Sequence, residues 1–326
     1  MIFVDFDIKN NFFLAPMAGI TDLAFRTLCR ECGAGLCYTE MVSAKALHYN
    51  DKKTYSLLKT SSQDTPLVVQ IFGSEPEIIA EAVKKIADMG YKMVDINCGC
   101  PAPKITSNGE GSSLMKSPLL IGEIVTKAVK ASDIPISIKI RAGYDKESIN
   151  AVECAKIAEE CGASAVTVHG RTRDEFYSGT SDWNIIKHVK ENVSIPVIGN
   201  GDITSPESAE NMFLETNCDA IMIGRGSLGK PYIFEQIEDY FNNGNYKKIY
   251  TLEERISFIL NQVNLMAEYK SDRQVSLESR KHIAWYLKGI KHSKIFREEA
   301  NSVSSILEIK SLCKKILSSK DIYGSI

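Results

Sequence analysis

The spacing of apolar residues along the chain changes near residue 240. Before that point, short runs of apolar and β-branched residues alternate with stretches in which apolar residues recur at helical spacing. Some runs are apolar at nearly every position, as at residues 195–198 and 220–223, which is typical of parallel strands buried on both faces. The pattern predicts eight strands, at residues 12–18, 36–41, 66–72, 93–99, 134–141, 165–171, 195–201 and 220–226.

Helical segments lie between these strands, and the spacing predicts helices at residues 75–89, 119–130, 146–161 and 206–215. A weak internal repeat supports this order, because Met89-Gly90 and Cys161-Gly162 each precede an apolar run that finishes in a polar residue. Eight strand-then-helix units predict an α/β fold, a (β/α)8 TIM barrel. An open, doubly wound sheet is the alternative, and the count of eight favours the barrel.

Beyond the loop signal Asn-Asn-Gly-Asn at residues 242–245, only helical spacing remains. The predicted helices cover residues 252–269, 277–291, 294–300 and 303–317. We therefore expect two domains, a barrel at residues 1–241 and a small all-helical domain at residues 242–326.

The charge of the chain is divided unevenly between these two parts. The net charge is −2, but residues 242–326 carry 15 Lys and Arg against 9 Asp and Glu, whereas residues 1–241 carry 24 against 32. A basic C-terminal part favours contact with a polyanion. A helical domain with a solvated, Lys-rich surface accounts equally well for the same numbers.

The cysteines and the hydropathy of the chain indicate the cellular compartment and whether a metal site is expected. No apolar run reaches the roughly 18 residues of a membrane span, and residues 1–5 lack the features of a signal peptide. Nine cysteines without an export signal are typical of reduced thiols, so we expect a cytoplasmic protein without a membrane contact. Cys98 and Cys100 have no matching second pair, which makes a poor zinc signature, and we expect no metal.

Candidate functional residues lie at the carboxyl ends of the predicted strands, where barrels carry their sites. Gly201 follows the seventh strand, and Gly224 and Gly226 follow the eighth, with Arg225 between them. Backbone N–H groups in such turns can approach an anion closely and Arg225 can neutralise it, which favours a phosphate site. Glycines that only make tight turns are the alternative.

Lys139 stands inside the fifth predicted strand, where burial of a charge costs several kcal/mol unless an anion meets it. A reduced flavin, negative at its N1–C2=O edge, would be one partner, and an ion pair with a carboxylate such as Asp95 would be another. The sequence leaves both open.

Two further side chains carry candidate chemistry. Cys100 stands in a loop between Gly99 and Pro101, and an ordinary thiol with a pKa of about 8.5 is protonated at neutral pH and can donate a proton. Cys98 is expected to pack as a small apolar residue. His169 ends the sixth strand at the expected mouth of the barrel, before a polar loop at residues 170–179.

These segments together resemble the tRNA-dihydrouridine synthase family, and its bacterial B-type branch most of all. The resemblance spans nearly the whole chain, and an Asn-x-Gly-Cys-Pro motif with a flavin-site Lys and His separates this family from other FMN barrels. It rests on residues 15–22, 70–73, 95–101 with Lys104, 139–143, 169–172, 198–203 and 222–226. The chain departs from the family's usual residues at Cys98 and at residues 107–111.

The resemblance implies an FMN-binding barrel, a helical domain that binds tRNA, and NADPH as the reductant; we also expect a monomer. Carried over by position, Pro16, Met17 and Ala18 would lie against the flavin ring, Gln70 at its polar edge, Lys139 at N1/O2, and His169 nearby. The ribityl phosphate would be held by Asn200, Gly201, Asp202, Gly224 and Arg225. Cys100 would be the catalytic proton donor, and Asn97 and Tyr177 would face the uracil.

The implied reaction is transfer of a hydride from reduced FMN to C6 of a tRNA uridine, with a proton from Cys100 to C5, giving 5,6-dihydrouridine. An FMN-dependent oxidoreductase of small pyrimidines, like dihydroorotate or dihydropyrimidine dehydrogenase, is the alternative, but it leaves the basic C-terminal part unexplained. A non-catalytic RNA-binding barrel is a further alternative, and the presence of both Cys100 and Lys139 argues against it.

Overall fold

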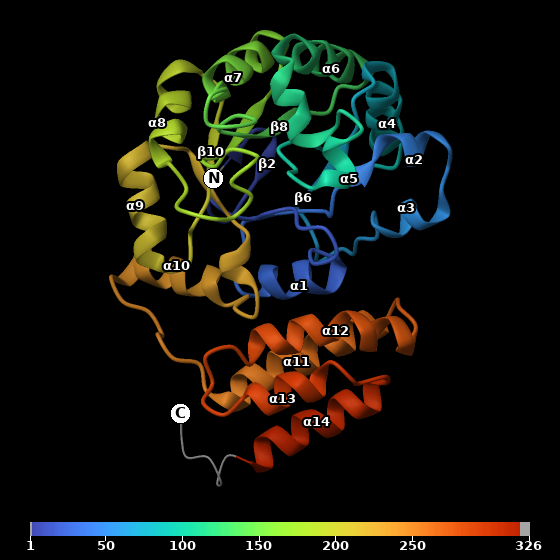
Figure 1. The fold of residues 1–326 in the computed structure, drawn as a ribbon, viewed down its shortest axis with the longest axis vertical. Helices are drawn as coiled ribbons and strands as arrows, with labels where there is room; N and C mark the ends of the chain where they lie inside the picture. Colours follow the sequence, from blue (N-terminus) through green and yellow to red (C-terminus); the bar gives the residue numbers. More distant parts are fainter. Residues whose placement is uncertain (1, 320–326) are drawn as a thin grey trace.

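The computed structural model describes residues 2–319 and shows a closed barrel with a group of helices beneath it (Figure 1). Each barrel strand pairs in parallel with its two neighbours, and pairing of β4 with both β3 and β6 closes the ring. The barrel strands are β3 (Phe12–Leu14), β4 (Leu36–Tyr38), β6 (Leu67–Phe72), β7 (Val94–Cys98), β8 (Ile136–Arg141), β9 (Ala165–His169), β10 (Val197–Asn200) and β11 (Ala220–Ile223). A short strand, β5 (Val42–Ser43), lies against β6 outside the ring.

The (β/α)8 barrel and its eight predicted strands are therefore confirmed. Most strands end earlier than the apolar pattern predicted, because the chain leaves the sheet where it must turn. Pro16, just past β3, has no N–H to donate to a neighbour, and Gly201, just past β10, has a φ of +130°. The residues past the strand ends form loops instead.

The N-terminal end of the barrel interior is filled by apolar side chains. A hairpin formed by β1 (Ile2–Phe3) and β2 (Phe6–Asp7) brings Phe3 and Phe6 into one buried cluster with Phe13 and Met222. The rings of Phe3 and Phe13 meet edge to face, with centroids 4.9 Å apart. The polar end of the interior is consequently the opposite one, at the carboxyl ends of the strands.

An outer layer of helices covers the barrel (Figure 1). Its long helices are α1 (Leu23–Glu31), α4 (Pro76–Asp88), α6 (Pro118–Ala131), α7 (Ala151–Glu160), α8 (Trp183–Asn192), α9 (Pro206–Thr216) and α10 (Ile233–Asn243). The four helices predicted in this region are confirmed. The segment predicted from residue 146 begins only at Ala151, because Gly143 and Ile149 first form an isolated antiparallel bridge.

Shorter helical pieces complete the barrel part of the chain. They are α2 (Ala44–His48), α3 (Lys52–Ser56), α5 (Pro103–Thr106), and the 3-10 turns η1 (Gly111–Lys116) and η2 (Arg225–Ser227). No helix among residues 2–319 is long and apolar enough to cross a membrane.

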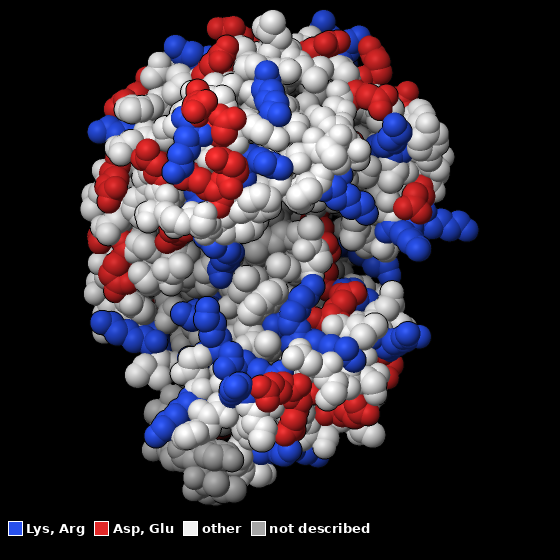
Figure 2. Space-filling view, in the orientation of Figure 1, with Lys and Arg blue, Asp and Glu red and all other residues white. Residues whose placement is uncertain are grey.

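Up to residue 319, four helices follow the barrel: α11 (Leu252–Ala267), α12 (Asp272–Tyr286), α13 (Lys294–Ala300) and α14 (Ile306–Ser318). They share a buried apolar cluster that contains Ile256, Ile283 and Ile309. A hollow lies between these helices and the barrel, with Lys and Arg around it (Figure 2). The last residues of the expected helical domain, 320–326, lie outside the described part of the chain.

The prediction for the second of these helices was wrong, because it placed both ends of the helix five residues too late in the chain. Helix α12 begins at Asp272 because Ser271 and Gln274 form a capping box, and its last helical residue is Tyr286. The predicted segment, residues 277–291, would have carried the helix through Gly289, which has a φ of +81°.

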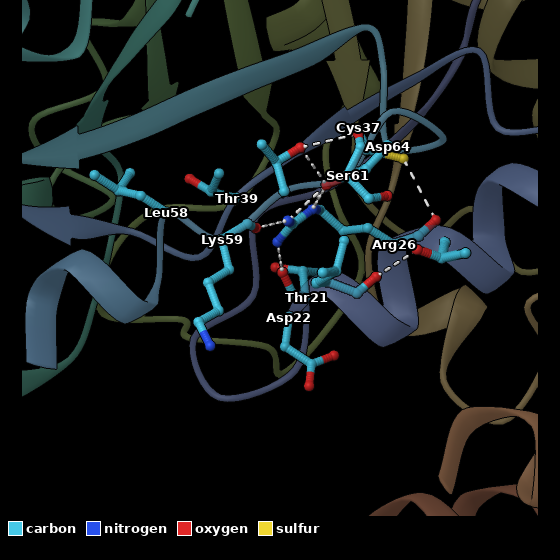
Figure 3. Close-up of polar contacts among 12 residues, drawn as sticks. Thr21, Asp22, Arg26, Cys37, Thr39, Leu58, Lys59, Ser61 and Asp64 are labelled. Atoms are coloured by element: carbon cyan, nitrogen blue, oxygen red, sulfur yellow. Dashed lines mark hydrogen bonds and ion pairs between the residues drawn. The ribbon is translucent and has the colours of Figure 1, made fainter. Parts of the chain in front are cut away.

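A buried ion pair anchors α1 to the loops beside it (Figure 3). The guanidinium of Arg26, which is 0% exposed, donates from Nε and Nη2 to Oδ2 of Asp64 at 2.9 and 2.7 Å. It also donates to the carbonyls of Thr21 and Lys59, at 2.8 and 2.7 Å. Burial opposes the charge of Arg26, but Asp64 keeps the pKa of Arg26 above its ordinary value. One side chain thus joins the loop after β3, α1 and the segment before β6.

The C-terminal helices attach to the barrel at the start of α1. Asp22 caps α1 by accepting from the N–H of Phe25 at 3.0 Å, and its second oxygen accepts from Tyr269 at 3.0 Å and from Lys270. The hydroxyl of Tyr269 also accepts from the N–H of Ala24 at 3.0 Å. The helical part therefore contacts the residues that directly follow the loop after β3.

We expect Arg26→Met to lower the free energy of unfolding by about 3–5 kcal/mol, because it leaves the carboxylate of Asp64 buried and unpaired. Urea unfolding followed by fluorescence measures this loss. Lys84→Met is the control, because it removes an exposed pair with Asp88 that contributes at most about 1 kcal/mol. Losses of similar size in the two variants would contradict the anchoring role of Arg26.

Candidate active site

A cavity of about 830 Å³ opens at the carboxyl ends of the barrel strands. It lies where the polar end of the barrel interior was expected. Every residue predicted for the site lines it: Pro16, Met17, Ala18, Gln70, Asn97, Cys100, Lys139, His169, Tyr177, Asn200, Gly201, Asp202, Gly224 and Arg225. The structure thus brings these residues together, whatever the role of each.

Strand register decides which side chains meet at the cavity floor. Asn97 on β7 is opposite Lys139 on β8, and Arg141 on β8 is opposite His169 on β9. Alternate residues of a strand point to the same face, so Lys139 and Arg141 both face the interior. The register therefore brings the two cations of β8 together with Asn97 and His169 at the cavity floor.

Lys139 is held by an amide rather than by a carboxylate. Its Nζ donates to Oδ1 of Asn200 at 2.8 Å, and Nδ2 of Asn200 donates to the carbonyl of Met222 at 2.7 Å. Within residues 2–319 no carboxylate lies at ion-pair distance from Lys139, so the ion pair with Asp95 is not formed. Burial, and then the charge of Arg141, lower the pKa of Lys139 to about 7.

The pKa values of two other basic side chains, Arg141 and His169, are lowered in the same way. Burial lowers the pKa of Arg141 to about 10. Burial and the nearby charges of Lys139 and Arg141 lower the pKa of His169 well below its ordinary value, so its imidazole is neutral at pH 7. These shifts mean that the cavity disfavours further positive charge and favours an anion.

Asp202, just past β10, is held between two arginines. Arg171 donates to both of its carboxylate oxygens, at 2.8 and 2.7 Å, and Arg225 donates to Oδ1 at 3.0 Å. Despite partial burial, these hydrogen bonds keep the pKa of Asp202 below its ordinary value. The guanidinium of Arg225 also lies over the ring of Tyr177, 4.7 Å from its centroid. Asp202 and Tyr177 therefore fix where Arg225 points.

The glycines past β10 and β11 are required by close packing. A Cβ atom at Gly201 would lie 2.2 Å from Oγ of Ser181, and one at Gly226 would lie 2.1 Å from the carbonyl oxygen of Ile203. Packing alone therefore explains these two glycines. Arg225 is the feature that favours an anion beside them.

Cys100 stands in a loop whose backbone is fixed from two sides. The N–H groups of Gly99 and Cys100 donate to Oδ1 of Asn97 at 3.2 and 2.9 Å. The carbonyl of Cys100 accepts from both the N–H and the hydroxyl of Ser112, at 3.0 and 2.9 Å. Burial raises the pKa of the Cys100 thiol, so it is protonated at neutral pH.

Cys98 differs from Cys100 in its surroundings. It is 0% exposed and belongs to the main apolar core, as the sequence predicted. In the described part of the chain, no group of three or more His, Cys, Asp or Glu side chains is arranged to hold a metal ion.

Several cavity residues were missed by the sequence prediction, namely Met41, Phe176, Trp285 and Lys288. A signal was present for Arg141, which the sequence places with Lys139 at the carboxyl end of the fifth strand, and it lines the cavity. None existed for Trp285 and Lys288, which come from α12 and the residues just after it. The wall of the cavity is thus shared between the barrel and the helical part.

Comparison with known proteins gives consistent results. The family model described as dihydrouridine synthase (Dus) matches residues 13–321. A probable tRNA-dihydrouridine synthase of Rickettsia bellii is 40% identical over 93% of this chain and 94% of its own length. The tRNA-dihydrouridine synthase B of Pasteurella multocida is 41% identical over 92% of this chain and 90% of its own length.

Solved structures share the barrel at low sequence identity. A histamine dehydrogenase from Rhizobium sp. superposes with a TM-score of 0.57 at 15% identity, and covers 79% of this chain. A 2-naphthoyl-CoA reductase superposes with a TM-score of 0.58 at 13% identity, and covers 75% of this chain. The chain spans about half the length of these two proteins, 49% and 52% respectively, and the likeness concerns the fold alone.

The fold and these relatives define an enzyme of the flavin-dependent oxidoreductase class. Within that class, the chain belongs to the dihydrouridine synthase family, whose model matches nearly all of it.

The low pKa of Lys139 predicts a pH-dependent stability for the protein without a bound anion. The unfolded chain holds this proton up to a pKa of about 10.4, whereas the folded chain releases it near 7, so raising the pH favours the folded state. Between pH 7 and 9, the free energy of unfolding should rise by about 1 kcal/mol per pH unit more in wild type than in Lys139→Met. Urea titrations at several pH values measure this difference, and parallel slopes would contradict it.

Proposed function

We propose that the protein reduces uridine in tRNA to 5,6-dihydrouridine, using FMN that is reduced by NADPH. The observation that carries this proposal is the position of Cys100. A protonated thiol stands on a fixed loop at the wall of a cationic cavity that also holds Lys139. Relatives at about 40% identity are named as tRNA-dihydrouridine synthases, which supports the same substrate. We further propose that the enzyme acts as a monomer in the cytoplasm.

The residues of the cavity fit FMN in size and in charge. A cavity of about 830 Å³ is within the usual range for a bound cofactor. Pro16, Met17 and Ala18 would lie against the ring, and Lys139 would meet its electron-rich N1–C2=O edge. The half-buried ammonium of Lys139 has no carboxylate partner among the described residues, and an anionic ring edge would supply the missing negative charge.

The rest of the cofactor would lie toward β10 and β11. Arg225 would bind the phosphate, with Asn200, Gly201 and Gly224 beside it. A carboxylate repels a phosphate, so we assign Asp202 the role of orienting Arg225. Gln70 and His169 would contact the polar parts of the ring as neutral groups. Bound FMN would supply the hydride from its N5 atom.

Addition of a hydride at C6 of uracil leaves negative charge toward C5 and the C4 carbonyl, and a positioned acid must then protonate C5. The thiol of Cys100 would give this proton. The thiolate left behind would be stabilised by the charge of Arg141, whose Nε donates to the carbonyl of Gly99 at 2.8 Å. Asn97 and Tyr177 would hold the uracil.

The uridine must leave its stack to reach this cavity, which costs a few kcal/mol and calls for contacts beyond the base. Lys and Arg gather around the hollow between the barrel and the helices (Figure 2). Trp285 and Lys288 bring the helical part to the cavity wall itself. We propose that residues 242–326 form the tRNA-binding domain and contact the backbone of the RNA. An enzyme for small pyrimidines would have no use for such a wall.

If Cys100 is the proton donor, Cys100→Ala should bind FMN and accept hydride from NADPH at near wild-type rates, because neither step needs the thiol. Reoxidation of the reduced flavin by unmodified tRNA should be slower by roughly 10²- to 10⁴-fold. Rapid mixing that follows flavin absorbance measures both steps.

Cys98→Ala is the matched control for this experiment, because Cys98 lies in the apolar core and should show wild-type reoxidation. Wild-type reoxidation in Cys100→Ala, or slow reoxidation in Cys98→Ala, would overturn the assignment of the proton donor.

Lys288 tests the RNA contact. Lys288→Glu should weaken tRNA binding and reduce the slope of log affinity against log salt by about one, because a phosphate contact is lost. Lys92→Glu makes the same change of net charge at an exposed position just before β7, at the end of the barrel opposite the cavity, and should leave the slope unchanged. Equal slopes in the two variants would contradict a contact at Lys288.

A further inference from the structure

A continuous chain of hydrogen bonds leads from a buried carboxylate to the loop of Cys100. Nε2 of Gln70 donates to Oδ2 of Asp95 at 2.7 Å, and Nδ2 of Asn97 donates to Oε1 of Gln70 at 2.8 Å. Oδ1 of Asn97 then accepts from the N–H groups of Gly99 and Cys100. We call Asp95, Gln70 and Asn97 the amide chain.

The amide chain has a direction, and Asp95 sets it at the inner end. An amide side chain has a donor side and an acceptor side of nearly the same shape, so only the polarity of its partners decides which way it turns. An ionised carboxylate only accepts, which turns the donor side of Gln70 toward Asp95 and its acceptor side toward Asn97. Asn97 is thereby left with its oxygen toward the loop.

Burial prevents the two amide side chains from turning over. Asp95, Gln70 and Asn97 are 0%, 1% and 7% exposed, so little solvent reaches them to satisfy a reversed amide. Burial also raises the pKa of Asp95 to about 6, which still leaves the carboxylate ionised at pH 7. If Asn97 turned over, its NH2 group would face two backbone N–H groups, and both loop hydrogen bonds would be lost.

We propose that Asp95 is a positioning residue for Cys100, acting through the amide chain to hold the thiol loop in its reactive place. This inference rests on the proposed function, in which Cys100 donates the proton. Asp95 does not line the cavity, and its second oxygen accepts from the hydroxyl of Ser137 at 2.6 Å. Its contribution is therefore the acceptor that it offers to Gln70.

Three variants separate the acceptor role of Asp95 from its charge. Asp95→Leu removes the acceptor. Asp95→Asn removes the charge but keeps an oxygen for Gln70, because the hydroxyl of Ser137 can accept from the new NH2 group. Ser137→Ala removes the other hydrogen bond to the same carboxylate and leaves the amide chain intact.

The expected result is a split between these variants in two measurements. In Asp95→Leu, reoxidation of reduced flavin by tRNA should slow by about 10- to 100-fold, while NADPH reduces the flavin normally. Hydrogen exchange at residues 98–101, followed by mass spectrometry, should become faster. Asp95→Asn and Ser137→Ala should stay within about threefold of wild type in both measurements.

Other outcomes would overturn the inference. If Asp95→Asn is as slow as Asp95→Leu, the charge matters and the acceptor does not. If exchange at residues 98–101 is unchanged in Asp95→Leu, the carboxylate does not hold the loop. Should Asp95→Leu fail to fold, Gln70→Met breaks the amide chain one step later and must speed the same exchange. A wild-type protein that forms no dihydrouridine would refute the proposed function, and the exchange pattern would still decide the role of Asp95.

Discussion

The half-buried position of Lys139 beside other cations, with no carboxylate among the described residues at ion-pair distance, is the constraint on which the rest of the cavity depends. Two carboxylates in this part of the barrel are engaged elsewhere: Asp95 accepts from Gln70 and Ser137, and Asp202 accepts from Arg171 and Arg225. A neutral amide contacts the ammonium instead, since Oδ1 of Asn200 accepts its hydrogen bond. The folded chain tolerates this arrangement because the lowered pKa of Lys139 reduces its positive charge at neutral pH. An anionic ligand would neutralise the charge that remains.

The loops around this charge are fixed from outside the barrel. The residues between β3 and α1 line the cavity on one side, and α1 is tied down at two points. Arg26 joins it through a buried ion pair to Asp64 in the segment before β6, and Asp22 joins it to Tyr269 and Lys270 of the helical part. The helical part therefore does more than extend the surface, since it contacts the segment that would lie against a bound ring and adds Trp285 to the same wall.

Much of the fold was predictable because parallel barrel strands are buried on both faces and leave a strong apolar signal. The cavity residues were predictable because all such strands end at one rim. The hydrogen-bond partner of Lys139 was not predictable, because it depends on strand register. Where β7 pairs with β8, Lys139 lies opposite Asn97, whereas Asp95 lies two residues deeper, opposite Ser137. The predicted segment for α12 was displaced along the chain, because the start of this helix is set by the cap at Ser271, which apolar spacing does not show. Trp285 could not be assigned, because its contact with the cavity exists only after the two parts pack.

Residues 107–111, where we predicted a departure from the family's usual residues, lie behind the loop of Cys100 in this structure. Within the described residues, the cavity wall takes none of its members from 103–112. Gly111 instead packs behind the thiol loop with a φ of +59°, and there is no room for a Cβ atom, which would lie only 2.8 Å from the carbonyl oxygen of Cys100. Ser112 donates twice to that same carbonyl. The amide chain holds the N–H side of the loop while Gly111 and Ser112 hold its carbonyl side, so this segment positions the thiol without itself facing the cavity.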